Sequence, residues 1–363
     1  MSEARAAGAM TNMPPQCARS RVEEQVRFLP LKVLAFSALA AAVGLFSASA
    51  PAAPAPAPQK LVPLKVAYDG YSMTTAPMNY AVQKGIFKKH GLDVTISYVD
   101  AGTTLTQAVV GGSVGIAQNG YTPAAAAAVQ GADIVFIGGI SNQLPFQLVV
   151  KSNIRSAADL KGKKIAISRI GSSTDIAATY VLRHLGLNRS DVAILQLGGE
   201  GTRTAAMLSG QIDASLEQYP RTGELVAKGY RVLVDCLEIA VDYPNTSYVS
   251  TRAFIQKNPD VVKRFLMGIS EGIHEFRQNK DEALRLTASF LKSAPGPDLD
   301  KAFDVFTTRV YPDIPRPSLK GIGIVLDEMK ARVPKAGQVK PESLIYTAPF
   351  DELEKEGFFT KLN

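Results

Sequence analysis

The sequence predicts an α/β protein with two similar lobes that face each other across a cleft. Between residues 64 and 250, short apolar runs alternate with helical patterns, which is the connectivity of α/β folds. The two halves of this region also share matching segments, which are 65–67 with 164–166 and 108–121 with 206–219. A repeated α/β unit places the turns after its strands at equivalent ends of two sheets, where open α/β sheets bind ligands.

Each half is read from short apolar runs, which predict strands, and longer periodic patterns, which predict helices. In the first half, we expect strands at 64–68, 93–99, 114–117, 134–140 and 146–150, with helices at 76–90, 104–110 and 121–130. In the second half, we expect strands at 164–168, 192–196, 214–217, 231–234 and 246–250, with helices at 173–185, 202–209 and 220–227.

After Ser250 the pattern changes to one helix after another. Asn258 and Pro259 form a typical helix start, with a capping residue followed by proline at the first helical position. Several prolines then separate the predicted helices, which are 259–278, 281–292, 298–310 and 319–332.

Residues 27–50 have the layout of a secretory signal peptide. Arg27 and Lys32 precede a 14-residue apolar run, and small residues follow it. This run is shorter than the roughly 20 residues needed to span a bilayer, so a retained membrane anchor is the weaker alternative. We interpret residues 1–26 as a non-native or unstructured extension and residues 51–60, which begin with alternating Ala and Pro, as a linker. The expected location is therefore the periplasm.

Composition argues against a nucleic-acid partner and does not indicate catalysis. The net charge of +7 is spread along the chain without blocks of Lys and Arg. The sequence contains no Walker loop, no G-x-S-x-G, no H-E-x-x-H and no Cys/His set with metal spacing. We therefore expect no cofactor, no metal ion and no enzymatic activity. Cys236 would be the only cysteine after export, so no internal disulfide is expected.

A turn of small residues between a predicted strand and a predicted helix is the first candidate binding element. It consists of Gly171, Ser172, Ser173 and Thr174. Unpaired backbone N–H groups and the dipole at a helix start favour a bound anion. The alternative is that Ser172 only caps the helix, with Asp175 completing a pair similar to a capping box.

The repeat gives this turn a counterpart in the first half, at residues 69–75. We expect the Ser72 and Thr74 hydroxyls of this counterpart turn to contact a solute and either Tyr71 or Tyr121 to cover an apolar part of it. The alternative is that Ser72 or Thr74 caps the helix that begins near Ala76.

Three further residues are candidates because of their positions next to these turns. Asn119 and Glu217 end strands that the repeat makes equivalent, and Arg169 lies beside the Gly171 turn. Asn119 could instead close its own turn. Glu217 needs a partner or a ligand amine, and a salt bridge to Arg221 is the alternative. Arg169 could pair with a carboxylate or sulfonate, although an arginine beside a turn is more often solvated.

Residues 77–94 carry a resemblance to a known family. They read P-M-N-Y-A-V-Q-K-G-I-F-K-K-H-G-L-D-V. This segment resembles the P-x-x-x-A-x-x-x-G-x-F-x-x-x-G-L-D-V pattern of type 2 periplasmic binding proteins of ABC importers, in the NMT1/THI5-like or SsuA-like group that includes sulfonate, taurine, nitrate and thiamine-precursor binders. Further matches lie at 108–115, 159–166 and 208–214, within a resemblance that covers about residues 64–335.

The resemblance implies a periplasmic binding protein type 2 fold, in which two lobes close on a solute by hinge motion. It implies a first lobe at 61–150, a second lobe at 151–246, and a return at 247–363 whose helices pack on the first lobe. The crossings between lobes are then expected near 149–152 and 243–250.

The resemblance also implies a function. The expected solute is a small organic anion, such as a sulfonate or carboxylate, or a related nitrogen or sulfur compound, and Ser141 is expected to point into the same cleft. The expected partners are a membrane permease and its ATPase, with the binding protein itself a monomer. The alternatives are an enzyme on the same fold for pyrimidine or menaquinone-precursor synthesis, and a sensory or chemotaxis protein.

Overall fold

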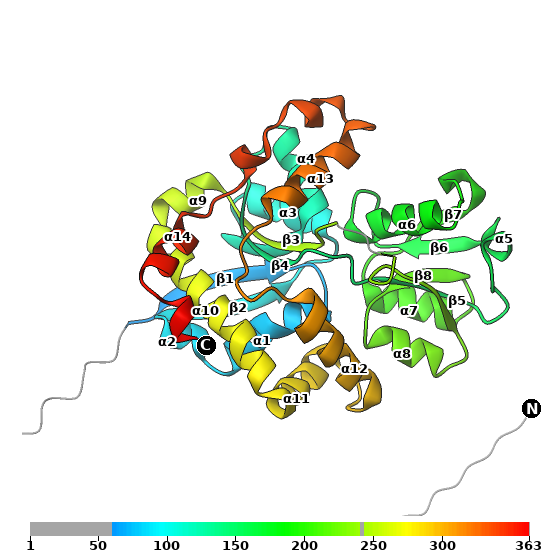
Figure 1. The fold of residues 1–363 in the computed structure, drawn as a ribbon, viewed down its shortest axis with the longest axis horizontal. Helices are drawn as coiled ribbons and strands as arrows, with labels where there is room; N and C mark the ends of the chain where they lie inside the picture. The colour runs from blue at the N-terminus through cyan, green and yellow to red at the C-terminus, as the bar shows by residue number, and fades with distance from the viewer. Residues whose placement is uncertain (1–59, 240–242, 363) are drawn as a thin grey trace, which may run out of the picture. The chain divides into compact units, whose positions relative to one another are not determined.

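Two five-stranded sheets organise the computed structural model, which describes residues 60–239 and 243–362 (Figure 1). The first sheet has the order β2-β1-β3-β10-β4, formed by Leu92–Tyr98, Val62–Tyr68, Ile116–Gly120, Thr246–Ser250 and Val135–Ser141. The second has the order β7-β6-β8-β5-β9, formed by Ala193–Gln196, Lys164–Ile167, Ala214–Glu217, Gln147–Val150 and Arg231–Asp235.

The two sheets have equivalent topologies. In the first, β1 pairs in parallel with β2 and β3, and β10 pairs antiparallel with β3 and β4. In the second, β6 pairs in parallel with β7 and β8, and β5 pairs antiparallel with β8 and β9. The matching segments 65–67 and 164–166 lie within equivalent strands, β1 and β6, which agrees with the repeat inferred from the sequence.

The first crossing between sheets comes earlier in the chain than we expected. We placed it near 149–152, with the first lobe ending at residue 150, but β5 is a buried strand of the second sheet. The apolar Leu148, Val149 and Val150 pair with neighbours on both edges, so β5 needs a central position. The chain therefore crosses between Ser141 and Gln147. On the return, Thr246 already begins β10 of the first sheet.

Helices connect the strands in both halves. The first half contains η1 (Met73–Thr75), α1 (Ala76–Gln83), α2 (Ile86–Lys89), α3 (Gly102–Val110) and α4 (Tyr121–Val129). The second contains α5 (Ala157–Leu160), α6 (Ser173–His184), η2 (Arg189–Asp191), α7 (Glu200–Leu208) and α8 (Arg221–Val226). The remaining helices are α9 (Arg252–Lys257), α10 (Pro259–Gln278), α11 (Lys280–Leu291), α12 (Pro297–Val305), η3 (Phe306–Val310), α13 (Leu319–Lys330), η4 (Pro334–Gln338), η5 (Pro341–Leu344), α14 (Ala348–Lys355) and η6 (Phe359–Lys361).

Two of the differences between the predicted and observed helices are a division and an earlier start. The helix expected at 76–90 is divided into α1 and α2, because Gly85 takes a φ of 70°, which interrupts helical geometry. The helix expected at 202–209 begins earlier, at Glu200. The second difference matters for the site, since it places Glu200 in the first turn of α7.

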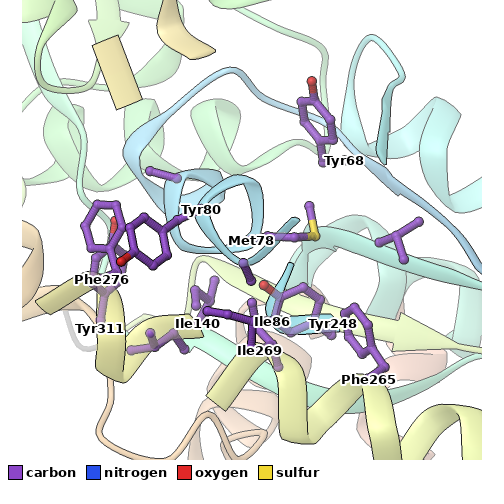
Figure 2. Packing of buried hydrophobic residues seen from close by; sticks show 14 of the residues in the cluster. Tyr68, Met78, Tyr80, Ile86, Ile140, Tyr248, Phe265, Ile269, Phe276 and Tyr311 are labelled. Atoms are coloured by element: carbon purple, nitrogen blue, oxygen red, sulfur yellow. The ribbon is translucent and has the colours of Figure 1, made fainter. Parts of the chain in front are cut away.

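The C-terminal helices pack on the first half of the chain. Both α10 and α11 contact α1, α14 contacts α10, and α13 contacts α4. Figure 2 shows Phe265 and Ile269 of α10 in one cluster with Tyr248 of β10 and Ile86 of α2. Burial of each large apolar side chain contributes about 1.5 to 3 kcal/mol, so this cluster ties the C-terminal helices to the first sheet.

The expected signal peptide at 27–50 and the extension at 1–26 lie outside the described residues, as does all of the linker except its last residue. Within residues 60–239 and 243–362, no helix is long and apolar enough to cross a membrane.

Candidate functional site

A cavity of about 80 Å³ lies between loops that belong to the two sheets. From the first half of the chain it is lined by Asp69, Gly70, Ser72, Thr74, Ala101, Gly102, Gly120 and Pro123. From the second half it is lined by Ser168, Ser172, Ser173, Thr174, Gly199, Glu200, Arg203 and Gln218. The crossing segments add Phe146, Asn245 and Thr246. Most of these residues follow the carboxyl ends of strands, the usual position of ligands in open α/β sheets.

The start of α6 forms one wall of the cavity. Ser172 is the N-cap residue, and its hydroxyl accepts a hydrogen bond from the Asp175 backbone N–H at 3.4 Å. Ser168 Oγ donates to Ser172 Oγ at 2.8 Å, and Thr174 Oγ1 accepts from the Ser168 backbone N–H at 2.8 Å. Ser172 therefore caps α6. Ser172, Ser173 and Thr174 also line the cavity, so capping and ligand contact are compatible here.

Gly171 shapes this turn but does not line the cavity. Its φ of 83° lies in the left-handed region that favours glycine. Its backbone N–H donates to Asp175 Oδ2 at 2.9 Å, so the group that we expected to be open to an anion is already bonded. Asp175 is buried and also pairs with Arg189.

The turn after β1 forms the opposite wall. Ser72 Oγ and Thr74 Oγ1 lie 2.7 Å apart, and both side chains line the cavity. Neither caps a helix: Ser72 precedes η1 without a side-chain cap bond, and the N-cap position of α1 is held by Thr75. The Thr75 hydroxyl instead donates to the Gly70 carbonyl at 2.9 Å, which closes the turn.

Asn119 does not line the cavity, and its side chain has a structural role. It is fully buried. Its Nδ2 donates to Thr106 Oγ1 at 2.7 Å and to the Gly102 carbonyl at 3.2 Å, and its Oδ1 accepts from the Gly120 N–H at 2.8 Å. These contacts match the alternative that Asn119 only closes its own turn.

Glu217 lies behind the cavity wall. It is fully buried, accepts a hydrogen bond from Ser215 Oγ, and has Oε1 3.7 Å from Arg203 Nε. The salt bridge that we considered with Arg221 does not form, because Arg221 pairs with Glu224 at 2.8 Å. Burial raises the pKa of Glu217 above its ordinary value.

The other three expected residues also lie outside this cavity. The Ser141 hydroxyl donates to the Gln143 carbonyl at 2.7 Å, and Arg169 is exposed. Tyr71 is 40% exposed and lines a second cavity, together with Tyr98 and Phe290. The rings of Tyr71 and Tyr98 are 4.7 Å apart. Gly70 and Glu200 line both cavities, so the two spaces are adjacent.

Two acidic residues that the sequence did not single out as site residues line the main cavity. Asp69 directly follows β1, and burial raises its pKa from 3.8 to about 6. Glu200 opens α7, and burial, with the charge of Glu217 as a further cause, raises its pKa from 4.5 to about 8. The position of Asp69 at a strand end could have marked it as a candidate. Glu200 lies before the helix expected at 202–209, so the sequence did not place it at a helix start.

Arg203 and Gln218 also line the cavity. Arg203 Nη1 donates to the Gly198 carbonyl at 2.8 Å and Nη2 to the Leu216 carbonyl at 3.0 Å. Gln218 is 6% exposed, and its Oε1 has no hydrogen-bond partner. Among the described residues, no group of three or more His, Cys, Asp or Glu side chains is arranged to hold a metal ion.

The two equivalent sheets, with a polar cavity lined from both, define a two-lobed periplasmic binding protein fold. The alkanesulfonate-binding protein SsuA from Xanthomonas axonopodis pv. citri, solved with bound MOPS, has this fold, with a TM-score of 0.67 and 21% identity over 79% of this chain and 99% of that chain. The chain belongs to the NMT1/THI5 like family, whose sequence profile matches residues 72–283.

Two curated relatives show how the family varies. The taurine-binding periplasmic protein of Escherichia coli K12 is 29% identical over 62% of this chain and 70% of its own length. The 4-amino-5-hydroxymethyl-2-methylpyrimidine phosphate synthase THI13 of Saccharomyces cerevisiae is 24% identical over 54% of this chain and 61% of its own length. The family thus includes proteins named for binding and a protein named for synthesis.

Proposed function

We propose that this protein is the solute-binding component of an ABC importer and captures a small organic solute between its two lobes. The observation that carries the proposal is the polar cavity, with Ser72 and Thr74 on one wall and Ser172, Ser173 and Thr174 on the other. Micromolar binding needs about 8 kcal/mol, and one charge-assisted hydrogen bond contributes only about 1.5 to 3. A solute therefore has to contact both walls.

The proposal includes a location and partners. The signal-like segment at 27–50 favours export to the periplasm, which is also where the taurine-binding relative is named as working. A monomer would deliver the solute to a membrane permease with its ATPase. Co-purification of the permease with the solute-loaded protein, and sedimentation of the protein alone as a single copy, test these two statements.

A thermal-shift screen tests solute binding directly. The compounds are alkanesulfonates, taurine, aromatic carboxylates, nitrate and pyrimidines. A compound present at 100 times its dissociation constant adds about 2.7 kcal/mol to the stability of the folded protein, which raises the melting temperature measurably. Isothermal titration then gives the affinity of each compound that produces a shift. No shift by any compound would contradict the proposal.

A pair of hydroxyl deletions tests the position of the site. Thr74→Val removes a hydroxyl from the cavity wall while preserving the shape of the side chain, so we expect weaker solute binding. Thr308→Val is the matched control, because the Thr308 hydroxyl is exposed and donates only to the Asp304 carbonyl in its own helix. Equal affinity of both variants would place the solute elsewhere.

Because one relative is named as a synthase, an enzyme on the same fold is the alternative function. We propose that this chain is not an enzyme, and the fate of the bound solute decides the question. Mass spectrometry of a compound incubated with the protein and then released by denaturation should return it unchanged and in stoichiometric amount. A changed product that accumulates over many turnovers would support the enzyme.

A further inference from the structure

The residues that line the main cavity favour one chemical class of solute. This inference deepens the proposed function and rests on it. The polar lining of the cavity combines hydroxyls with two carboxyl groups, that of Asp69 from the first half of the chain and that of Glu200 from the second. Hydroxyls can donate or accept hydrogen bonds, whereas a carboxylate can only accept them. The two carboxyl groups therefore restrict which solutes fit.

The carboxyl of Asp69 has space made for it by a glycine. Asp69 Oδ2 lies 2.6 Å from the position that a Cβ on Gly102 would occupy. Any larger residue at position 102 would displace the carboxyl group. Asp69 and Gly102 both line the cavity, so this local packing places the carboxyl group at the cavity wall.

Glu200 and Gln218 supply further hydrogen-bond acceptors to the cavity. Glu200 Oε1 accepts from the Gln218 backbone N–H at 3.3 Å. The Gln218 side chain is more than nine-tenths buried, lines the cavity and has an Oε1 without a hydrogen-bond partner. A buried acceptor without a donor costs about 1 to 3 kcal/mol, which a solute N–H group would recover.

Arg203 is the single cationic side chain among the described residues that line this cavity. Its Nη1 and Nη2 donate to two backbone carbonyls, its Nε lies 3.7 Å from Glu217 Oε1 without a hydrogen bond, and its side chain is 4% exposed. Two carboxyl groups beside a mostly engaged guanidinium therefore favour a solute that donates N–H bonds over one that carries only negative charge.

We propose that the solute carries a basic nitrogen group, such as an amine or an amidine, and that Asp69 and Glu200 hold its N–H donors. The unpartnered Oε1 of Gln218 accepts a further N–H bond. The hydroxyls of Ser72, Thr74, Ser173 and Thr174 hold the rest of the solute, including an acidic group where one is present. Burial raises the pKa of both Asp69 and Glu200, and a bound cationic N–H group would favour the charged form of each carboxyl.

Matched pairs of compounds test the inference by isothermal titration at pH 7. Taurine is compared with isethionate, in which a hydroxyl replaces the amine, and benzamidine with benzamide, which has a similar shape but no positive charge. We expect the nitrogen base in at least one pair to bind at least tenfold more tightly than its partner. The oxygen or neutral partners binding as tightly as the bases would overturn the inference.

Variants then assign the preference to residues. Glu200→Gln and Asp69→Asn preserve side-chain shape and should each reduce the preference for the base at least tenfold. Glu282→Gln is the matched control, because Glu282 is remote from the cavity and pairs with Arg285. A preference that survives both cavity variants, in proteins that remain folded by circular dichroism, would also overturn the inference.

Ethanesulfonate and benzoate, which have no N–H group, separate this inference from the proposed function. Binding of these anions with no binding of the bases would overturn the inference alone, since a solute-binding protein would remain. No binding by any compound would count against both.

Discussion

The Ser173 hydroxyl oxygen lies 2.6 Å from the position that a Cβ on Gly120 would occupy. Gly120 ends β3 of the first sheet, and Ser173 begins α6 beside the second. The two halves of the chain thus approach each other closely at the cavity, and a Cβ at residue 120 would force Ser173 Oγ to move. The glycine at position 120 therefore allows the two walls of the cavity to come close together.

Gly120→Ala should weaken solute binding at least tenfold while the protein still folds, because the new methyl group meets Ser173 Oγ and keeps the two walls apart. Isothermal titration measures the loss. Gly323→Ala is the control, since a Cβ there meets only Pro341 Cγ, at an ordinary 3.8 Å. Unchanged affinity of Gly120→Ala would mean that the walls approach without this contact.

Ser172→Ala should lower the free energy of unfolding by about 1 kcal/mol through the lost helix cap and should also weaken solute binding. Thr251→Ala provides a matched comparison, because Thr251 caps α9 through the Phe254 backbone N–H at 3.0 Å and does not line the cavity. Urea unfolding and titration of both variants separate the two roles. If Ser172→Ala loses stability and keeps full affinity, Ser172 is only a cap.

Glu200→Gln should flatten the pH dependence of stability between about pH 4.5 and pH 8. The folded state raises the pKa of Glu200 from 4.5 to about 8, so it binds more protons than the unfolded state in this window. Stability consequently falls as the pH rises through it. The groups around Glu200 are Glu217, which raises the pKa further, and Arg203 and Arg221, which lower it.

Urea unfolding of the wild type and Glu200→Gln at several pH values measures this effect. Glu282→Gln is again the control, because the Glu282 pKa is lowered to about 2 by Arg285 and Lys84. The contribution of Glu282 to stability therefore changes with pH only below about pH 4.5. Parallel curves for the wild type and Glu200→Gln would show that Glu200 titrates normally.

Gly268→Ala should destabilise the fold by about 1 to 3 kcal/mol, the usual cost of overpacking a core. A Cβ at this position of α10 would lie 2.4 Å from Phe87 Cδ1, and Phe87 is itself stacked on Phe265 with the ring centroids 5.5 Å apart. Thermal unfolding measures the loss. A variant as stable as Gly323→Ala would contradict the tight packing of α10 on α2.

Much of the fold was predictable from local pattern. The strand at 246–250 was placed without error, and the repeat anticipated the equivalence of β1 and β6. Strand β5 was recognised as a strand but assigned to the wrong sheet. Its apolar run indicates burial, yet only the pairing with β8 and β9, residues distant in sequence, decides which sheet buries it.

The candidate site divides in the same way. Ser72, Thr74 and residues 172–174 became candidates because small hydroxyl residues after a strand, at a helix start, have a local signature, and all of them line the cavity. Asn119 and Glu217 became candidates because of their positions at strand ends. A strand end does not show which way its side chain turns, and neither residue lines the cavity. Their hydrogen bonds to Thr106 and Ser215 turn them inward.

The α/β repeat, the family resemblance and the position of the two hydroxyl turns can be read from the chain alone, since each depends on neighbouring residues. That Asp69 and Glu200 line one cavity, and that Arg203 is bonded to backbone carbonyls, depends on the three-dimensional fold. Desolvation and charge pairing act between groups that are far apart in sequence. The electrostatic character of the cavity is therefore a property of how the two sheets meet.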